Sequence, residues 1–281
     1  MSASASDAGT AAYRFIPASP RAALLFVHGF AERSRRHEPT LVALAERGIA
    51  TFAFDLRGHG DAAGTRDYVG DFARLVADTA AMRRDVARAL PGVPLFIAGF
   101  SLGGLVALSS AADDANGLAG MILIAPGLDP AGRAPRALKG LGVFVGRYLP
   151  FVPVARVDFR PFDALPGEPL RRTRVIAART AAELMRASSV AFRRAPHVEL
   201  PALIFHGDRD RLVSSGGSRR FANELGGSDV TLRIVSGGDH ELLRDPTGDG
   251  VRDEIVAWIF ARSRGACLLI PAEPQPPGPV R

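Results

Sequence analysis

The stretch Gly99-Phe100-Ser101-Leu102-Gly103 decides the fold of this chain, because of what stands on either side of it. The apolar run 94–98 before it is typical of a buried strand, and residues 104–108 after it begin a helix-like stretch. A strand, a Gly-x-Ser-x-Gly pentapeptide and a helix form a nucleophile elbow. The helix N-terminus there favours the negative charge that develops in acyl transfer. The pattern predicts Ser101 as a nucleophile.

Short apolar runs recur along the chain, and helix-like stretches separate them. Such near-continuous apolar runs are expected of parallel strands that are covered on both faces. Between them, the segment 71–90 places its apolar residues close to one face of a helix. This alternation predicts an α/β fold with a doubly wound, mostly parallel sheet. The predicted strands are Ala23–Val27, Ala50–Phe54, Leu95–Ala98, Met121–Ala125, Ala202–His206 and Val230–Val235.

The alternation stops after residue 127, and no convincing strand follows until residue 202. A stretch of this length needs structure of its own, and residues 138–149 and 180–192 have helical character. We expect a helical cap at residues 128–197, inserted over the carboxyl ends of the strands, where ligands bind in such folds. The core then comprises residues 1–127 and 198–270. The Pro-rich tail 271–281 is expected to be disordered.

The excess positive charge is concentrated in the expected cap. The chain has a net charge of +6, but residues 128–197 hold 13 Lys and Arg against 5 Asp and Glu, which is +8. The remainder holds 22 against 24, which is −2. Aliphatic and aromatic residues interrupt the basic ones, which suits an anionic membrane surface. A solvated Arg-rich face is the alternative. We expect no nucleic-acid partner, since only this charge would favour one.

Composition and targeting signals limit where the protein acts. The hydrophobic fraction of 47% and the charged fraction of 23% are typical of a soluble globular protein. No apolar run approaches the ~20 residues of a membrane span. Residues 1–7 lack the basic and apolar regions of a signal peptide. The single cysteine, Cys267, excludes an internal disulfide and fits a reducing compartment. We expect a cytoplasmic protein, with peripheral membrane contact through the basic cap.

A serine nucleophile needs a general base and an acid that orients it. After an elbow they follow in the order acid, histidine. His240 is the one histidine of six that lies beyond the late strand 202–206, and a Gly-rich loop carries it. Asp208 and Asp210 both follow that strand. Asp208 comes directly after a glycine and is expected to cap its own turn, so we predict Asp210 as the acid and His240 as the base.

An oxyanion hole needs two backbone N–H donors. One is expected from Leu102, the residue after the nucleophile, and the other from the loop after an early strand. In Val27-His28-Gly29-Phe30, Gly29 allows close approach of the backbone, so Phe30 is predicted to supply the second N–H. His28 precedes the serine and ends a strand, which favours a structural hydrogen-bonding role for its ring.

Several motifs, in order and correctly spaced, carry a resemblance to one family. Taken together, these motifs make the chain resemble the monoacylglycerol lipase family, which is the lysophospholipase-like, serine-aminopeptidase-type branch of the α/β-hydrolases. The resemblance covers about residues 20–127 and 200–260. The motifs are His28-Gly29-Phe30-Ala31-Glu32 with Arg35-Arg36-His37, Asp55-Leu56-Arg57-Gly58-His59-Gly60, Gly64–Phe72, the elbow with Gly104, Gly207-Asp208-Arg209-Asp210, and His240-Glu241.

The chain departs from the family at three places. Phe100 stands in the elbow where the family usually has histidine. After Gly-His-Gly the family usually continues with x-Ser, whereas this chain continues with Asp61-Ala62-Ala63-Gly64. The cap 128–197 does not align with the family. The resemblance implies an α/β-hydrolase fold and an intracellular lipase or esterase that needs neither cofactor nor metal. It further implies a substrate with a single acyl chain, of the monoacylglycerol or lysophospholipid type.

The leading hypothesis is a serine hydrolase that cleaves carboxylic esters of amphipathic lipids through an acyl-enzyme. An acyltransferase or peptidase on the same triad is the first alternative, because the pocket selects the acyl acceptor. A non-catalytic lipid-binding protein is the second. Apolar residues of the cap are predicted to line an acyl channel, although packing on the core would equally explain each of them. These residues are Leu138, Leu141, Phe144, Tyr148 and Phe151.

Overall fold

A single large sheet forms the centre of the molecule, which is described here from a computed structural model. The structure describes residues 4–5, 11–129, 145–157, 174–244 and 247–263. Within them the main sheet has eight strands in the order β1-β2-β4-β3-β5-β6-β9-β10. Its strands are β1 Ser4–Ala5, β2 Ala11–Phe15, β3 Ala22–Val27, β4 Ile49–Phe54, β5 Leu95–Phe100, β6 Leu118–Ile124, β9 Ala202–Gly207 and β10 Val230–Val235.

The sheet is parallel from β4 to β10, and only the β1 and β2 edge runs antiparallel. All six predicted strands are present, and the predicted mostly parallel α/β fold is confirmed. Because these six strands run the same way, their carboxyl ends lie at one edge of the sheet. Every residue predicted for the catalytic machinery lies within a few positions after one of these strand ends.

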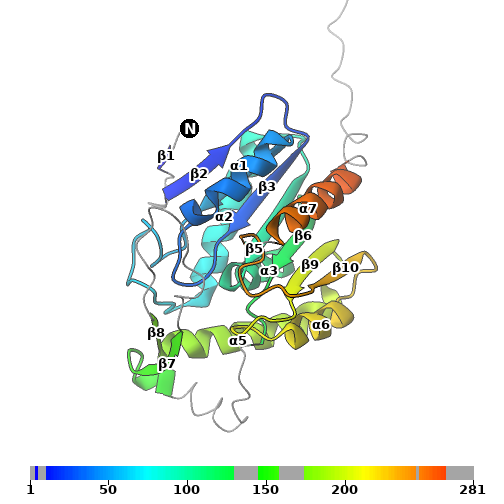
Figure 1. Ribbon diagram of the computed structural model, residues 1–281. Coiled ribbons are helices and arrows are strands. Elements are labelled where there is room, and N and C mark those ends of the chain that lie inside the picture. The colour runs from blue at the N-terminus through cyan, green and yellow to red at the C-terminus, as the bar shows by residue number, and fades with distance from the viewer. Residues whose placement is uncertain (1–3, 6–10, 130–144, 158–173, 245–246, 264–281) are drawn as a thin grey trace, which may run out of the picture.

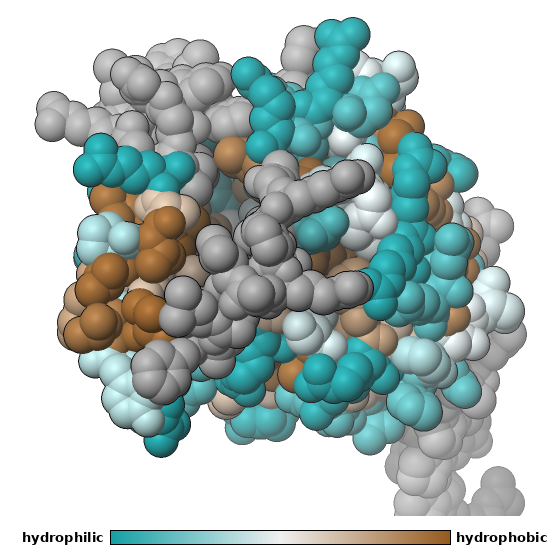
Figure 2. Space-filling view, turned by 90° about the horizontal axis from the view of Figure 1, so that it is seen from below, coloured by the Kyte–Doolittle hydropathy of each residue, from teal (hydrophilic) through white to brown (hydrophobic). Residues whose placement is uncertain are grey.

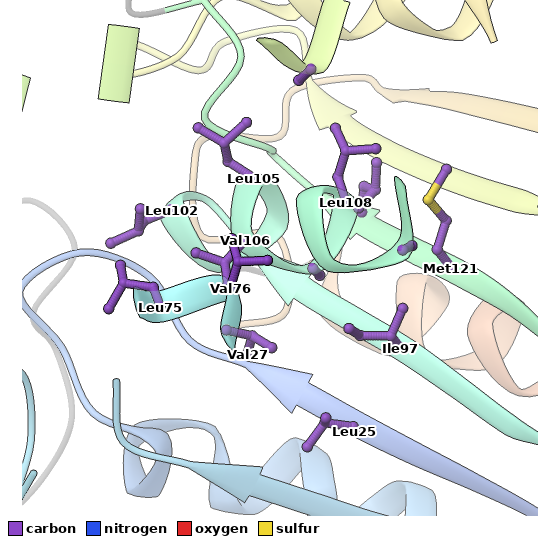
Figure 3. Close-up of a cluster of buried hydrophobic side chains, with 14 of the residues drawn as sticks. Leu25, Val27, Leu75, Val76, Ile97, Leu102, Leu105, Val106, Leu108 and Met121 are labelled. Atoms are coloured by element: carbon purple, nitrogen blue, oxygen red, sulfur yellow. The ribbon is translucent and has the colours of Figure 1, made fainter. Parts of the chain in front are cut away.

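Helices cover both faces of the sheet (Figure 1). One face packs against α1 Glu38–Glu46 and α7 Gly248–Ser263, and the other against α2 Phe72–Ala89, α3 Leu102–Asp113 and α6 Ser215–Glu224. A short 3-10 helix, Ser34–His37, precedes α1. Figure 3 shows part of the core on this second face of the sheet, where Val76 of α2 and Val106 of α3 lie next to Val27 of β3. Burying these apolar side chains fixes α3, and hence the elbow that precedes it, on the sheet.

The inserted segment between β6 and β9 differs from the prediction. It contains β7 Pro153–Val157 and β8 Arg174–Ala177, which pair antiparallel, so the expectation that no strand lies between residues 127 and 202 is wrong. Each strand is short, β7 begins at a proline, and arginines interrupt their apolar residues, which hides the pattern of a buried strand. The helix predicted at 180–192 is present as α5, Ala178–Arg194, and a 3-10 turn follows at Ala195–His197.

Other predictions for the insertion and the tail reach beyond the described residues. Of the helix predicted at 138–149, the structure describes residues 145–149 and shows a helical turn at 145–148. The Pro-rich tail 271–281 lies outside the described ranges. The division into a core and a cap at residues 128–197 stays a prediction, although β7, β8 and α5 lie together at one end of the molecule (Figure 1).

Buried hydrogen bonds attach α5 to the loop that precedes α2. The Val69 N–H donates to Thr180 Oγ1 over 2.9 Å, and the Phe72 N–H donates to Glu183 Oε2 over 3.0 Å. Phe72 begins α2, so the Glu183 carboxylate also lies at a helix N-terminus, where negative charge is stabilised. Thr180 and Glu183 are both buried. These contacts hold the inserted segment against the core from one side.

Candidate active site

The elbow places Ser101 in a backbone conformation that L-residues rarely adopt. Ser101 lies between β5 and α3 with φ 53° and ψ −116°. The glycines around it have no room for a side chain. A Cβ on Gly99 would lie 2.2 Å from the Gly103 carbonyl oxygen, and one on Gly103 would lie 2.0 Å from the carbonyl oxygen of Val27. The Gly-x-Ser-x-Gly pattern is therefore required by close backbone contacts at both ends of the turn.

The structure brings the three predicted catalytic side chains together. His240 Nε2 lies 3.0 Å from Ser101 Oγ, and His240 Nδ1 lies 2.7 Å from Asp210 Oδ2. Ser101 follows β5, Asp210 follows β9 and His240 follows β10, so three of the four strands β5, β6, β9 and β10 supply them, all at one edge of the sheet. The Nδ1–H of His240 donates to the carboxylate, which leaves Nε2 as the acceptor for the serine hydroxyl.

The surroundings of Asp210 and His240 favour their charged forms. Burial raises the pKa of Asp210, but the hydrogen bonds from His206 and His240 outweigh it and hold this pKa well below its usual range. Burial lowers the pKa of His240, but the hydrogen bond and the charge of Asp210 outweigh it, so its pKa is raised above 6.5. An imidazolium at His240 would thus be stabilised in place.

Asp208 and Asp210 have different roles in the same loop. Asp210 Oδ1 accepts hydrogen bonds from the N–H groups of Leu212 at 2.8 Å and Val213 at 2.9 Å. Asp208 was expected to cap its own turn, but its Oδ1 accepts from the N–H of Gly237 over 2.8 Å. Gly237 belongs to the loop that carries His240. Asp208 therefore joins the acid loop to the histidine loop, while Asp210 contacts the imidazole.

The two predicted oxyanion donors lie on adjacent segments of backbone. Leu102 is the first residue of α3, and Phe30 follows β3. Within the described part of the chain, neither N–H donates to a protein acceptor. The Gly29 N–H donates to Glu32 Oε1, which fixes the turn that holds Phe30. The Cβ position of Gly103 is only 2.4 Å from the His28 carbonyl oxygen, so the two segments touch.

His28 has the structural role expected of it. Its Nε2 accepts from the N–H of Leu56 over 2.9 Å, and its Nδ1–H donates to the Gly29 carbonyl over 2.7 Å. The ring is completely buried. It joins the end of β3 to the segment after β4, and both its nitrogens are occupied.

A buried ionic cluster behind the site was not predicted. Glu32 Oε1 lies 2.9 Å from His37 Nε2, and Glu32 Oε2 lies 3.4 Å from Arg36 Nε. Arg36 Nη2 lies 3.6 Å from Glu241 Oε1. Burial and the charge of Glu32 raise the pKa of Glu241. Glu32 and Glu241 stood in the motifs that carry the family resemblance, but nothing in their local sequence indicated that they would meet. The cluster links the Phe30 turn to the residue after His240.

Phe100 separates this cluster from the imidazole. Its ring centroid lies 5.7 Å from that of His37 and 4.9 Å from that of His240. It thus places an apolar ring where the resembling family usually has histidine. His206, which contacts Asp210, was also not predicted; its signal in the sequence is a histidine within an otherwise apolar strand.

Of the five channel residues predicted for the cap, the structure describes two, and both are exposed. Tyr148 is 62% exposed and Phe151 is 66% exposed. Phe151 stacks on Tyr68, with the ring centroids 5.0 Å apart. Leu138, Leu141 and Phe144 lie outside the described residues. Among the side chains that the structure does describe, no three His, Cys, Asp or Glu residues are grouped so that they could hold a metal ion.

Comparisons with known proteins show which family the chain resembles. Residues 18–247 match the model of the serine aminopeptidase S33 family. The monoacylglycerol lipase of Mycolicibacterium smegmatis is 26% identical over 86% of this chain and 89% of its own length. The human monoglyceride lipase is 29% identical over 90% of this chain and 87% of its own length.

Solved structures show the same fold. The crystal structure of the Paleococcus ferrophilus monoacylglycerol lipase superposes with a TM-score of 0.75 at 25% identity, covering 89% of this chain and 98% of that one. A soluble variant of the Saccharomyces cerevisiae monoglyceride lipase, solved with a substrate analogue, superposes with a TM-score of 0.77 at 19% identity, covering 90% and 91%. The chain therefore belongs to the serine aminopeptidase S33 family, in the monoacylglycerol lipase-like branch of the α/β-hydrolases, and is a carboxylic ester hydrolase with a serine nucleophile.

Proposed function

We propose that this enzyme hydrolyses esters of lipids with a single acyl chain, of the monoacylglycerol type, with Ser101, His240 and Asp210 as its triad. The observation that carries the proposal is the chain of two hydrogen bonds from Ser101 Oγ through His240 to Asp210. The lipid substrate is supported by the names of the relatives, which are monoacylglycerol and monoglyceride lipases.

Acylation follows from the geometry. Ser101 Oγ attacks the ester carbonyl as its proton passes to His240 Nε2. Asp210 accepts from Nδ1–H throughout and stabilises the imidazolium. The carbonyl oxygen becomes negative and accepts from the N–H groups of Phe30 and Leu102. When the tetrahedral intermediate collapses, the C–O bond to the alcohol breaks, the alcohol leaves with the proton from His240 Nε2, and the acyl group stays on Ser101.

Deacylation repeats these steps with water. His240 Nε2 takes a proton from a water molecule, which attacks the acyl-enzyme carbonyl. The second tetrahedral intermediate is held by the same two N–H groups. Its collapse breaks the bond to Ser101 Oγ, which regains the proton, and a fatty acid is released. If an alcohol or amine took the place of water, the enzyme would act as an acyltransferase.

A substrate panel tests the proposed specificity. We expect turnover of a monoacylglycerol and of a lysophospholipid to exceed that of a diacylglycerol and of a peptide p-nitroanilide. Ser101→Ala should abolish turnover of all of them, with a short-chain aryl ester as a common reference. Faster cleavage of the anilide than of the monoacylglycerol would contradict the lipid assignment while leaving the triad intact. Products formed with added alcohols or amines measure the acyltransferase alternative.

We also propose that the inserted segment contacts an anionic lipid surface. Six of the seven large apolar side chains that stand exposed in the described ranges belong to residues 148–154 and 175, and we call these six the cap patch. Figure 2 shows a hydrophobic area on the side of the molecule where β7 and β8 lie in Figure 1. The patch consists of Tyr148, Leu149, Phe151, Val152, Val154 and Val175.

Basic residues accompany the cap patch. Arg147 and Arg156 are exposed beside it, and the Arg174 guanidinium lies 3.3 Å from Asp67. Exposed aromatic and aliphatic side chains flanked by arginines suit the boundary between acyl chains and anionic head groups. None of the described helices has the length and hydropathy required to cross a membrane. The lipid contact proposed here is therefore one at the surface, through side chains of the cap patch.

Vesicle binding tests this contact. We expect the protein to sediment with vesicles of phosphatidylcholine and phosphatidylglycerol more than with phosphatidylcholine alone. The double variant Leu149→Ser/Phe151→Ser should lose most of the binding and keep turnover of a water-soluble aryl ester. Ile16→Ser is the matched control, since Ile16 is 45% exposed but lies outside the patch. Equal binding by the double variant and this control would contradict the proposal.

A further inference from the structure

The carboxylate of Asp210 is held by a second histidine. His206 is the fifth residue of β9 and is completely buried. Its Nε2 lies 3.1 Å from Asp210 Oδ2 and 3.1 Å from the carbonyl oxygen of Val213. Its Nδ1 lies 2.7 Å from Ser218 Oγ on α6. Ser218 is also completely buried.

These partners determine where the protons are. A carboxylate and a carbonyl oxygen only accept hydrogen bonds, so Nε2 of His206 carries a proton and donates it between them. In the neutral ring Nδ1 then accepts from the Ser218 hydroxyl. Each polar atom of both side chains has a partner, although neither side chain reaches water. Hydrogen bonds thus run without a break from Ser218 on α6 to Ser101 on the elbow.

The contact with His206 changes how Asp210 is held. Oδ1 accepts two backbone N–H groups from residues 212 and 213, and Oδ2 accepts from His240 and from His206. Without His206, the His240 imidazole would be the one partner of Oδ2 among the residues that the structure describes. A carboxylate held firmly at Oδ1 alone can still displace Oδ2 through coupled changes of its two side-chain torsions, and His240 would move with Oδ2. Misplacement of about 1 Å at a catalytic group can cost about 10²-fold in rate.

We propose that His206 is a positioning residue, which holds Asp210 in the plane that orients His240, and that Ser218 fixes its tautomer. The proposal rests on the proposed triad. On this proposal β9 and the loop after it supply two residues of the site, His206 from the strand and Asp210 from the loop. His206 touches neither substrate nor reacting atoms, and it acts only through Asp210.

Two substitutions separate positioning from mere packing. In His206→Gln the side-chain amide reaches about as far as Nε2 and can still donate to Asp210. In His206→Asn the amide reaches only about as far as Nδ1, so it keeps Ser218 and loses Asp210. We expect kcat on an aryl ester to fall about 10²-fold in the Asn variant and less than about tenfold in the Gln variant, with KM within about twofold of wild type in both.

A spectroscopic measurement accompanies the kinetics. The His240 Nδ1 proton is hydrogen-bonded to Asp210, and we expect it to resonate far downfield in proton NMR spectra. We expect this resonance to persist in the Gln variant and to shift or broaden in Ser218→Ala and in the Asn variant. Thermal unfolding of all three variants shows whether they are folded, and the resonance of Ser218→Ala decides the matter if neither His206 variant folds.

The outcomes are distinct. Equal kcat in the Asn and Gln variants, or an unchanged resonance in Ser218→Ala together with a wild-type rate in the Asn variant, would overturn the positioning role. Asp210→Asn is measured alongside. If it too had a wild-type rate, the proposed triad itself would fail, which is a different result from an unimportant His206.

Discussion

In the proposed mechanism His240 must be neutral when Ser101 attacks, yet its surroundings favour the protonated ring. Burial alone would lower its pKa, but the hydrogen bond and charge of Asp210 outweigh burial and raise the pKa above 6.5. The same contact stabilises the imidazolium that forms after attack. A raised pKa makes His240 a stronger base. It also lowers the fraction of His240 that is neutral, and so able to accept a proton, at neutral pH. Activity should depend on pH through this one group.

Replacing Asp210 tests this balance. The kcat/KM of the wild type should rise with pH, with its midpoint above 6.5, because only the neutral imidazole accepts the serine proton. In Asp210→Asn the raising contact is lost and burial remains, so the midpoint should move below that of the wild type. The rate should also fall by about 10⁴-fold, since the ring loses its tautomer and orientation. A pH–rate profile of both proteins measures the two effects, and an unmoved midpoint would contradict them.

The meeting of Ser101, Asp210 and His240 could be predicted because each follows a strand and the fold fixes their chain order. Chain order does not reveal partners buried within a strand. His206 stands in an apolar run, and only the path of the loop that follows β9 shows that Asp210 comes back to contact its ring. The link from Asp208 to Gly237 was missed for the same reason, since it joins residues that are 29 positions apart.

The elbow joins β5 to α3 and presses α3 against the end of β3. The Cβ position of Gly103 lies 2.0 Å from the Val27 carbonyl oxygen and 2.4 Å from that of His28. Both of the proposed oxyanion donors stand beside this contact, Leu102 on α3 and Phe30 after β3. The spacing of these two elements therefore sets the distance between the donors.

Gly103→Ala should disturb both stability and rate. The added methyl cannot fit beside the backbone of β3, so α3 must move away from it. We expect a loss of about 3 kcal/mol in the free energy of unfolding and a fall in kcat. Gly250→Ala is the control, because its Cβ would meet no atom within 4 Å and alanine favours the helix α7. Denaturant unfolding compares the two, and equal stabilities would contradict the argument.

Elements at the edges of the fold were predicted least well. The six central strands are near-continuously apolar, and the sequence reveals them. The strands of β1, β2, β7 and β8 are short, and what makes them strands is their pairing with a neighbour. The pair β7 and β8 exposes Val154 and Val175, so burial does not mark them either. Hydrophobic periodicity reveals a strand when one of its faces is buried, and β7 and β8 bury little of theirs.

At the scale of the whole molecule, folding buries one histidine in its neutral form, so its protonation affects stability. His59 is completely buried, and its Nδ1 lies 3.1 Å from the Arg57 carbonyl oxygen. Its ring lies 5.4 Å from that of Phe30 and 5.8 Å from that of His28, between centroids. Burial, and then the nearby His28, lower its pKa to about 4. The folded protein therefore resists a proton that the unfolded chain accepts near pH 6.5.

This difference predicts how stability depends on pH. Between pH 6.5 and about 4 the unfolded chain binds more protons at this site, so the free energy of unfolding falls as the pH falls. A shift of this size corresponds to about 3 kcal/mol. In His59→Gln the decline between pH 7 and pH 4 should be smaller by about that amount. Urea unfolding at a series of pH values measures it, and parallel curves for the two proteins would show that His59 contributes nothing.

Covalent capture of Ser101 tests the proposed catalytic assignment most directly. A fluorophosphonate reacts with a serine only where a base activates it and an oxyanion hole receives the phosphoryl oxygen. Mass spectrometry should find one adduct, on the peptide that contains Ser101, with activity lost in proportion to its formation. Ser101→Ala should take up no label, and His240→Ala should react far more slowly. Labelling of a different serine, or undiminished ester turnover by Ser101→Ala, would contradict the account.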